Sequence, residues 1–259
     1  RMHHPMKNFE TLAEMQAYPL PDYTLVDFSP LQKKIDEIHA KGLAVFVWQE
    51  CTIWETAWYL RSMENLMMDM AMEDEKAVWL LDQITEKACY RAAIFARQGA
   101  DILGLGDDIG MQDSIMMSME MYQQWLKPRL AKVIRAAKNV NPDILISYHS
   151  CGYIEPFINE LIEVGVDILN PVQVKASDMD SKKIKKEFGN EITFWGGGCD
   201  PEVLLKGTKK EIEEEVKMRI EDLSPSGGFI FAPIHSIQAN TPPENIAVMY
   251  ETAIKYRKY

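Results

Sequence analysis

Long apolar runs are missing from this sequence, in which no 18 apolar residues follow one another. A membrane-spanning helix needs about 20 such residues, so we predict none. The start of the chain, RMHHPMKNFE, also lacks the apolar segment of a signal peptide. The composition, 47% hydrophobic and 26% charged, is that of a soluble globular protein, for which we expect a cytoplasmic location.

Cysteine and positive charge are also scarce. The four cysteines, at positions 51, 89, 151 and 199, are too few and too scattered for a disulfide scaffold, which favours reduced thiols. The formal net charge is -11. Binding to nucleic-acid phosphates requires clustered lysine and arginine, so we expect no nucleic acid as a partner. The lack of a membrane-spanning run likewise argues against a membrane.

Phosphate-binding motifs are absent as well, because neither GxGxxG nor GK[ST] occurs. The run GGG at 196–198 is therefore not interpreted as a phosphate loop. Three residues without side chains beside Cys199 would instead allow a ligand to approach the backbone closely.

Short β-rich runs alternate with helical patterns from residue 44 onward. The runs lie at 44–48, 101–106, 144–149, 167–171, 191–197 and 229–234. This alternation is typical of a parallel sheet built from βα units. Helix signals lie between the runs, including a capping box at Thr208 and Glu211 and the pair Pro242 and Pro243 at the start of the last helix.

We predict one α/β domain over residues 1–259, a (β/α)8 TIM barrel with an irregular part at 1–43 and βα units at 44–259. A closed barrel needs eight strands, and these runs supply six. TLVDF at 24–28 is only a weak further candidate. Either N-terminal strands are missing from the chain or the sheet is open, and we favour the missing segment.

Polar side chains follow nearly every predicted strand, at the point where the strand gives way to a loop. They are Glu50, Asp107, Asp108, His149, Cys151, Asn170, Gln173, Cys199, His235 and Gln238. The carboxyl ends of parallel barrel strands lie on one face, where barrel enzymes build their sites. We therefore expect these side chains to converge.

His149 and Cys151 are the firmest candidates for metal ligands. Side chains two apart on a strand point to the same side, and histidine with cysteine is a donor set that Zn²⁺ prefers. A lone histidine on an apolar strand is more often a hydrogen-bonded core residue, but here Cys199 and His235 follow neighbouring strands. Either supplies a third ligand, with a fourth position open for catalysis, and His235 is alternatively a substrate-facing group.

The paired acids Asp107 and Asp108 have two interpretations. One caps the following turn while the other is solvated, or one of them orients a metal ligand or substrate and handles a proton. Glu50 is a weaker catalytic candidate. Asn170, Gln173 and Gln238 are the predicted substrate-binding residues.

Five stretches together carry a family resemblance: TIWETAWYLRSMENLMMDM, LGDDIGMQ, YHSCGYIEPFINELIEVGVDILNPVQ, TFWGGGCDPEVL and GGFIFAPIHSIQANTPPENI. They resemble the uroporphyrinogen decarboxylase superfamily, and within it the branch of cobalamin-dependent methyltransferases, over most of residues 44–257. The resemblance implies a (β/α)8 barrel. It also implies a zinc site made by a His-x-Cys pair, matched by His149 and Cys151, and a further Cys. Many members carry that Cys at the last strand, where this chain has His235, while Cys199 lies one strand earlier.

The resemblance implies a zinc-dependent methyltransferase that moves a methyl group between a small substrate and a corrinoid protein. The substrate would be a methyl ether, a methylamine-type compound or a thiol. Cobalamin would be carried by the partner protein, because no corrinoid-binding DxHxxG motif is found in the chain. The alternatives are a metal-free decarboxylase of a polycarboxylate, although the RQAGR-type loop of such enzymes is absent, and a non-catalytic subunit of a methyltransferase complex.

Overall fold

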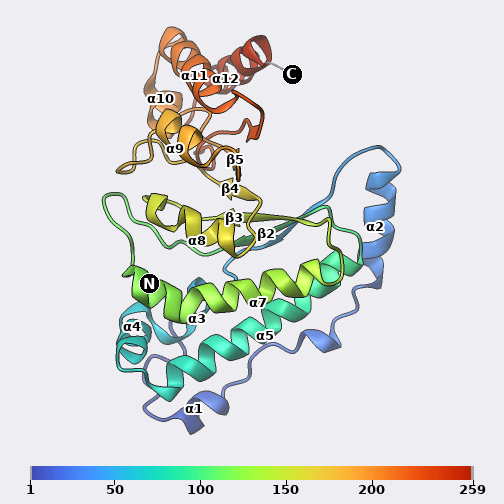
Figure 1. The fold of residues 1–259 in the computed structure, drawn as a ribbon, viewed down its shortest axis with the longest axis vertical. Coiled ribbons are helices and arrows are strands. Elements are labelled where there is room, and N and C mark those ends of the chain that lie inside the picture. Colours follow the sequence, from blue (N-terminus) through green and yellow to red (C-terminus); the bar gives the residue numbers. More distant parts are fainter. Residues whose placement is uncertain (1, 258–259) are drawn as a thin grey trace. The chain divides into compact units, whose positions relative to one another are not determined.

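The computed structural model describes residues 2–257 and contains a six-stranded sheet with the strand order β1-β2-β3-β4-β5-β6 (Figure 1). The strands are β1 (Phe46–Gln49), β2 (Ile102–Gly106), β3 (Leu145–His149), β4 (Ile168–Asn170), β5 (Thr193–Trp195) and β6 (Phe229–Ile230). The pairs β1 with β2, β4 with β5, and β5 with β6 are parallel. The predicted α/β fold of TIM-barrel type is confirmed, and each strand overlaps one of the six predicted runs.

Helices separate successive strands. They are α1 (Leu12–Gln16), α2 (Ser29–His39), α3 (Trp54–Arg61), α4 (Met63–Ala71), α5 (Glu75–Arg97), α6 (Met119–Met121), α7 (Lys127–Lys138), α8 (Ile158–Glu163), α9 (Ser181–Phe188), α10 (Pro201–Lys206), α11 (Lys209–Leu223) and α12 (Pro243–Tyr256). Short turns of helix are η1 (Tyr23–Leu25), the π-helical η2 (Tyr122–Leu126) and η3 (Glu155–Phe157). Among the described helices, not one combines the length and the apolar character that a membrane crossing requires.

Local signals explain several helix ends. The Thr208 and Glu211 side chains form the predicted capping box of α11. Proline occupies the first position of α12, as the Pro242 and Pro243 pair predicted. Asp200 caps α10 by accepting hydrogen bonds from the backbone N–H groups of Glu202 and Val203. These caps fix where the loops after β5 and β6 begin and end.

The N-terminal part contains regular structure. Residues 1–43, expected to be irregular, contain α1 and α2, and α1 begins with a second capping box, made by Thr11 and Glu14. The run at 24–28 is not a strand. The Asp22 carboxylate accepts hydrogen bonds from the backbone N–H and the hydroxyl of Thr24, and this local closure produces the 3₁₀ turn η1.

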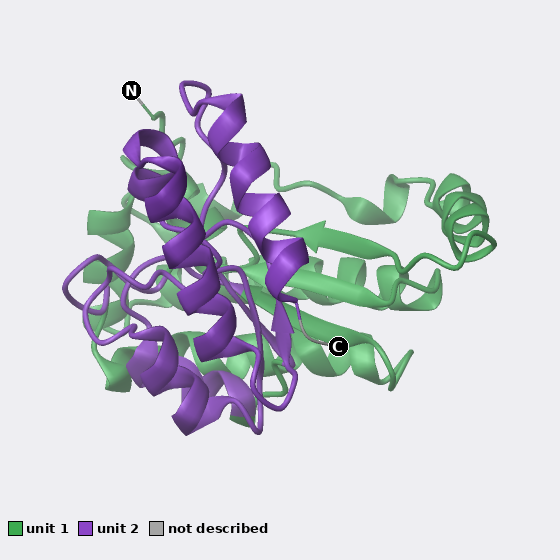
Figure 2. Ribbon diagram, turned by 90° about the horizontal axis from the view of Figure 1, so that it is seen from above, with its two compact units in different colours: residues 1–108, 117–148, 163–166 green, residues 109–116, 149–162, 167–259 purple. Residues whose placement is uncertain are grey.

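The chain divides into two compact units, coloured separately in Figure 2: residues 1–108, 117–148 and 163–166 form the first, and residues 109–116, 149–162 and 167–259 form the second. In the first unit, α5 packs along α7 and against β1 and β2. In the second, α11 packs along α12 around a core that includes Cys199, Ile212 and Met249. The single domain expected over residues 1–259 stays a prediction.

Candidate metal centre

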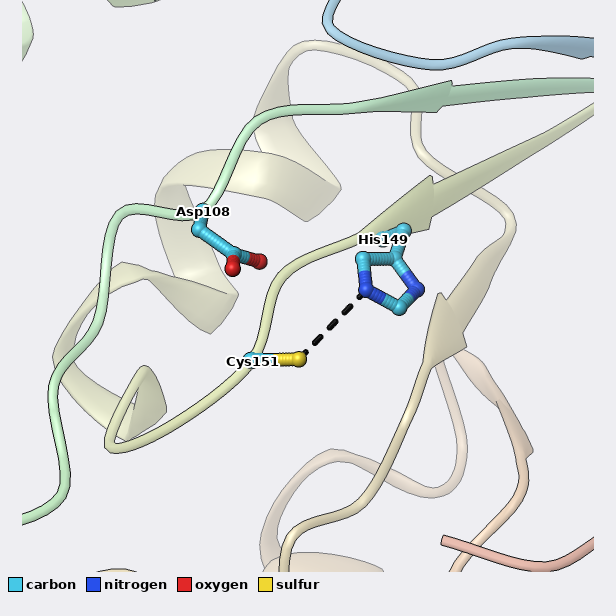
Figure 3. A group of neighbouring side chains, drawn as sticks. All are labelled: Asp108, His149 and Cys151. Atoms are coloured by element: carbon cyan, nitrogen blue, oxygen red, sulfur yellow. Dashed lines mark hydrogen bonds between the residues drawn. The ribbon is translucent and has the colours of Figure 1, made fainter. Parts of the chain in front are cut away.

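His149 and Cys151 face each other at the end of β3. His149 is the last residue of the strand, and its Nε2 atom lies 3.5 Å from the Sγ atom of Cys151, as the dashed line in Figure 3 marks. Both residues are half-buried. The spacing of two residues therefore brings an imidazole nitrogen and a thiol sulfur to one side of the loop.

The separation of these two atoms fits a shared metal ion. Zinc bonds of 2.0–2.1 Å to nitrogen and 2.3 Å to sulfur, at a tetrahedral angle, place the two ligand atoms about 3.6 Å apart. The observed 3.5 Å matches this value without any movement of the backbone. The donor set, imidazole with thiolate, is also one that zinc prefers.

Asn170 holds the imidazole in the orientation that a metal ligand requires. Its Oδ1 atom lies 2.7 Å from the Nδ1 atom of His149, and its Nδ2 atom donates to the carbonyl oxygen of Trp195 at 2.9 Å. Because the carboxamide oxygen only accepts, Nδ1 carries the ring proton and Nε2 presents its lone pair toward Cys151. A partner of this kind behind a histidine ligand is the usual support of a metal site.

Asp108 joins the pair. One ligand atom from each of Asp108, His149 and Cys151 lies within 4.8 Å of the other two, and all three residues are half-buried. The sequence predicted Asp108 as a catalytic acid, and the geometry adds it to the candidate ligands.

Asp107 is occupied differently. Its buried carboxylate accepts hydrogen bonds from the backbone N–H groups of Ile53 and Glu55, at 2.9–3.2 Å, and so caps α3, whose own N-cap residue Ile53 has no side-chain acceptor. Burial raises the pKa of Asp107 to about 8, although these backbone donors favour the charged form. Of the two predicted acids, Asp107 therefore caps a helix, whereas Asp108 lies near the candidate ligands His149 and Cys151.

Two glycines lock the ligand loop to the loop after β2. Gly152 has φ of +86°, and a Cβ atom on it would lie 2.5 Å from the carbonyl oxygen of Met111. A Cβ on Gly110 would lie 2.7 Å from the carbonyl oxygens of both Cys151 and Tyr153. Only glycine allows these backbones to approach so closely. Neither glycine was among the predicted site residues, although both lie in strand-end loops that carry candidate ligands.

Gln173 connects the ligand loop to a cavity of about 360 Å³ in the second unit. Its Oε1 atom accepts a hydrogen bond from the backbone N–H of Gly152 at 2.9 Å. Gln112, His235 and Gln238 also line the cavity. Gln112 was not predicted as a site residue, although it lies within the LGDDIGMQ stretch.

Comparison with known proteins agrees with this architecture. Residues 8–256 match the family model described as uroporphyrinogen decarboxylase (URO-D). The chain belongs to the URO-D family.

Curated URO-D relatives are similar over part of their length. The uroporphyrinogen decarboxylase of Rickettsia felis (strain ATCC VR-1525 / URRWXCal2) is 30% identical over 179 residues, which cover 69% of this chain and 48% of the relative. That of Rickettsia akari (strain Hartford) is 34% identical over 175 residues, which cover 66% of this chain and 47% of the relative. The chain thus spans about half the length of the curated relatives that it matches.

A solved structure shares the fold. It is described as a methyltransferase from Methanosarcina mazei and superposes with a TM-score of 0.73 at 24% identity, covering 98% of this chain and 71% of the other. At this level of identity the likeness shows a common URO-D type fold.

The remaining predicted residues of this URO-D chain lie elsewhere. Cys199 is fully buried in the core of the second unit, its Sγ atom 3.7 Å from the carbonyl oxygen of Asp200, and burial raises the pKa of its thiol to about 12. Glu50 lines a separate cavity of the first unit and accepts a hydrogen bond from the Trp48 indole. Neither belongs to the Asp108, His149 and Cys151 group.

Proposed function

We propose that this URO-D protein is a zinc-dependent methyltransferase that moves a methyl group between a small substrate and a corrinoid protein. The observation that carries the proposal is the arrangement of His149, Cys151 and Asn170. An Nε2 atom and an Sγ atom lie 3.5 Å apart, and the ring of the histidine is oriented by an amide oxygen behind it. A metal-free reaction has no need of this combination.

His149 and Cys151 would hold the Zn²⁺ ion, with Asp108 as the candidate third ligand. When bound, Zn²⁺ supplies Lewis-acid chemistry, polarising a methyl-ether oxygen or holding a substrate thiol as the thiolate. Asn170 keeps the imidazole in one tautomer, and Gln173 fixes the ligand loop through the Gly152 N–H. The chain thus fixes its ligand positions in advance, so that little reorganisation accompanies metal binding.

The cavity beside Gln173 is the proposed substrate site. His235 and Gln238 lie in its lining and offer hydrogen bonds to a polar substrate. The lysine in the lining, Lys175, is paired with Asp200 at 2.8 Å, so the cavity does not present an uncompensated positive charge there. This favours a neutral substrate such as a methyl ether or a thiol over a polyanion.

The 259 residues contain no DxHxxG motif, so the corrinoid would be carried outside them, as on a corrinoid protein. The methyltransferase description of the Methanosarcina mazei structure, which shares the fold, supports the same class of reaction. The direction of methyl transfer is shown by whether methylcobalamin or the methylated small substrate accumulates.

Decarboxylation is the second candidate, favoured by the names of the curated relatives. A polycarboxylate substrate requires cationic side chains that are available to bind it. Arg61, on the first helix after β1, is buried and bonded to Asp69 and to the carbonyl oxygen of Met6. It therefore does not present its guanidinium group to a substrate.

Elemental analysis tests the metal site. Zinc is measured in the wild-type protein, in Cys151→Ser and in the control Cys89→Ser, which alters a half-buried thiol on α5. We expect close to one zinc per chain in the wild type and the control, and loss of zinc in Cys151→Ser. Absence of zinc from the wild type, even after anaerobic reconstitution, would contradict the proposed zinc-dependent function.

Activity is followed by the absorbance change between cob(I)alamin and methylcobalamin on a corrinoid protein, with a methyl ether or a thiol as the small substrate. Transfer that requires bound zinc supports the proposal. Release of CO₂ from a porphyrinogen by the zinc-free protein would assign decarboxylation instead.

A further inference from the structure

A second cavity, of about 330 Å³, lies within the first unit. Four segments surround it: the loop at 18–23, the start of the loop after β1, α3 and one face of α5. Its lining residues are Tyr18, Pro19, Leu20, Pro21, Tyr23, Glu50, Cys51, Thr56, Leu60, Ile84, Lys87 and Arg91. None of the candidate metal ligands is among them.

Two cations of α5 line this cavity. Lys87 and Arg91 are four residues apart, so their side chains lie on the same face of the helix, one turn from each other. Within residues 2–257, neither forms an ion pair with a carboxylate. Most other buried or half-buried cations of the first unit are neutralised, as Arg61 is by Asp69 and Arg129 by Asp82.

The Arg91 guanidinium is held in place but incompletely bonded. Its Cζ atom lies 4.7 Å from the centre of the Tyr23 ring, a cation–π contact that fixes the plane of the group. Its Nε atom is buried and has no hydrogen-bond partner in the part of the chain that the structure describes. Because this Nε atom is closed to solvent, a ligand in the cavity would bond to the terminal nitrogens of the guanidinium group.

The charges around the cavity favour an anion that carries a single negative charge. Lys87 and Arg91 face one carboxylate, Glu50, whose Oε2 atom already accepts from the Trp48 indole. Asp22, near Lys87, uses its carboxylate to accept from Thr24. The lining is thus net positive in a chain whose formal charge is -11.

Most of the remaining lining is apolar. Leu20, Leu60 and Ile84 provide aliphatic surface, and Tyr18 provides an aromatic ring. Prolines at 19 and 21 fix the backbone of the loop that forms one wall. A preformed wall lowers the ordering cost of binding and favours a ligand with an apolar body.

We propose that this cavity binds a small organic monocarboxylate, with its carboxylate on Arg91 and Lys87 and its apolar or aromatic body between Tyr18 and the aliphatic residues. The two terminal nitrogens of an arginine form a two-pronged donor that matches a carboxylate. The inference is independent of the proposed methyl transfer, since it involves neither the metal ligands nor the cavity beside Gln173.

Binding of benzoate by the wild-type protein tests the proposal, with benzamide as the uncharged analogue and inorganic phosphate as the competing anion. We expect saturable binding of benzoate by calorimetry and no binding of benzamide. Arg91→Met should weaken benzoate binding at least tenfold. Arg97→Met, which alters an exposed arginine at the end of the same helix, should leave it unchanged.

Alkylation of Cys51 gives a second measurement that needs no variant. Cys51 lines the cavity, whereas Cys89 lies on α5 and does not. Saturating benzoate should slow the reaction of iodoacetamide with Cys51, read by peptide mass mapping, and leave the rate at Cys89 unchanged. Any one of three results would overturn the proposal. Benzoate could still bind to Arg91→Met with wild-type affinity, or phosphate could bind while benzoate does not. The third result is that benzoate neither binds saturably nor protects Cys51.

Discussion

The Nδ1 atom of His149 lies 2.7 Å from the Oδ1 atom of Asn170, so an amide at the end of β4 orients a histidine at the end of β3. If this contact supports a metal ligand, Asn170→Ala should weaken zinc binding about 10–100-fold, the usual effect of losing such a partner. Competition with a chromogenic chelator measures the affinity.

Asn170→Asp is the matched control. It keeps an oxygen acceptor for Nδ1, although it replaces the donor to the Trp195 carbonyl by a charged carboxylate oxygen, so we expect it to bind zinc more tightly than Asn170→Ala. Wild-type affinity in Asn170→Ala would show that Asn170 has no part in metal binding.

The third ligand is tested by three variants measured together. Asp108→Asn should lower zinc content or affinity, because Asp108 groups with His149 and Cys151. Cys199→Ala should keep its zinc and lose about 1 kcal/mol of unfolding free energy, since Cys199 is a core residue. His235→Ala should keep its zinc and change substrate affinity. Loss of zinc only in Cys199→Ala or His235→Ala would move the third ligand there.

Arg61 anchors the N-terminal segment through a buried ion pair. Its Nε atom lies 2.8 Å from Asp69, and its Nη1 atom donates to the carbonyl oxygens of Met6 and Phe9. Arg61→Met should therefore cost about 3–5 kcal/mol in urea unfolding, because Asp69 is left buried and unpaired. The double variant Arg61→Met with Asp69→Leu should recover part of that loss, whereas equal instability of both variants would argue that the carbonyl contacts dominate.

Asp107 gives the stability of the protein a pH dependence. Its pKa is raised by burial from an ordinary value of 3.8 to about 8, so the folded state binds a proton that the unfolded state releases. The stabilisation is complete below pH 4 and is lost as the pH rises through 8, with a slope of at most about 1.4 kcal/mol per pH unit. Asp107→Asn should flatten the fall in unfolding free energy between pH 5 and pH 9.

Asp22→Asn serves as the control for this titration. The pKa of the exposed Asp22 carboxylate is lowered by its hydrogen bonds to Thr24, so its contribution is lost at acid pH instead. An Asp107→Asn profile parallel to that of the wild type would mean that the backbone N–H donors keep Asp107 ionised.

The alternation of β-rich and helical runs was enough to predict the strands, because parallel strands buried on both faces read as continuous apolar segments. The helix α1 was not predicted although Thr11 and Glu14 have the spacing of a capping box, because its five residues are too few to show a helical hydrophobic periodicity. His149 and Cys151 could be paired from strand alternation alone. The support from Asn170 could not, because it depends on the register between β3 and β4, and the core position of Cys199 depends on packing by α11 and α12.

The close packing at Gly110 and Gly152 holds the loops at 109–112 and 149–153 together, because neither backbone can move relative to the other without a clash. The Tyr153 N–H also donates to the Met111 carbonyl oxygen at 2.7 Å. A shift of the loop that bears Cys151 must carry Gln112 with it, and Gln112 borders the cavity beside Gln173. Gln112 therefore keeps its position relative to Cys151, and the candidate ligand loop and this part of the cavity wall form one rigid unit.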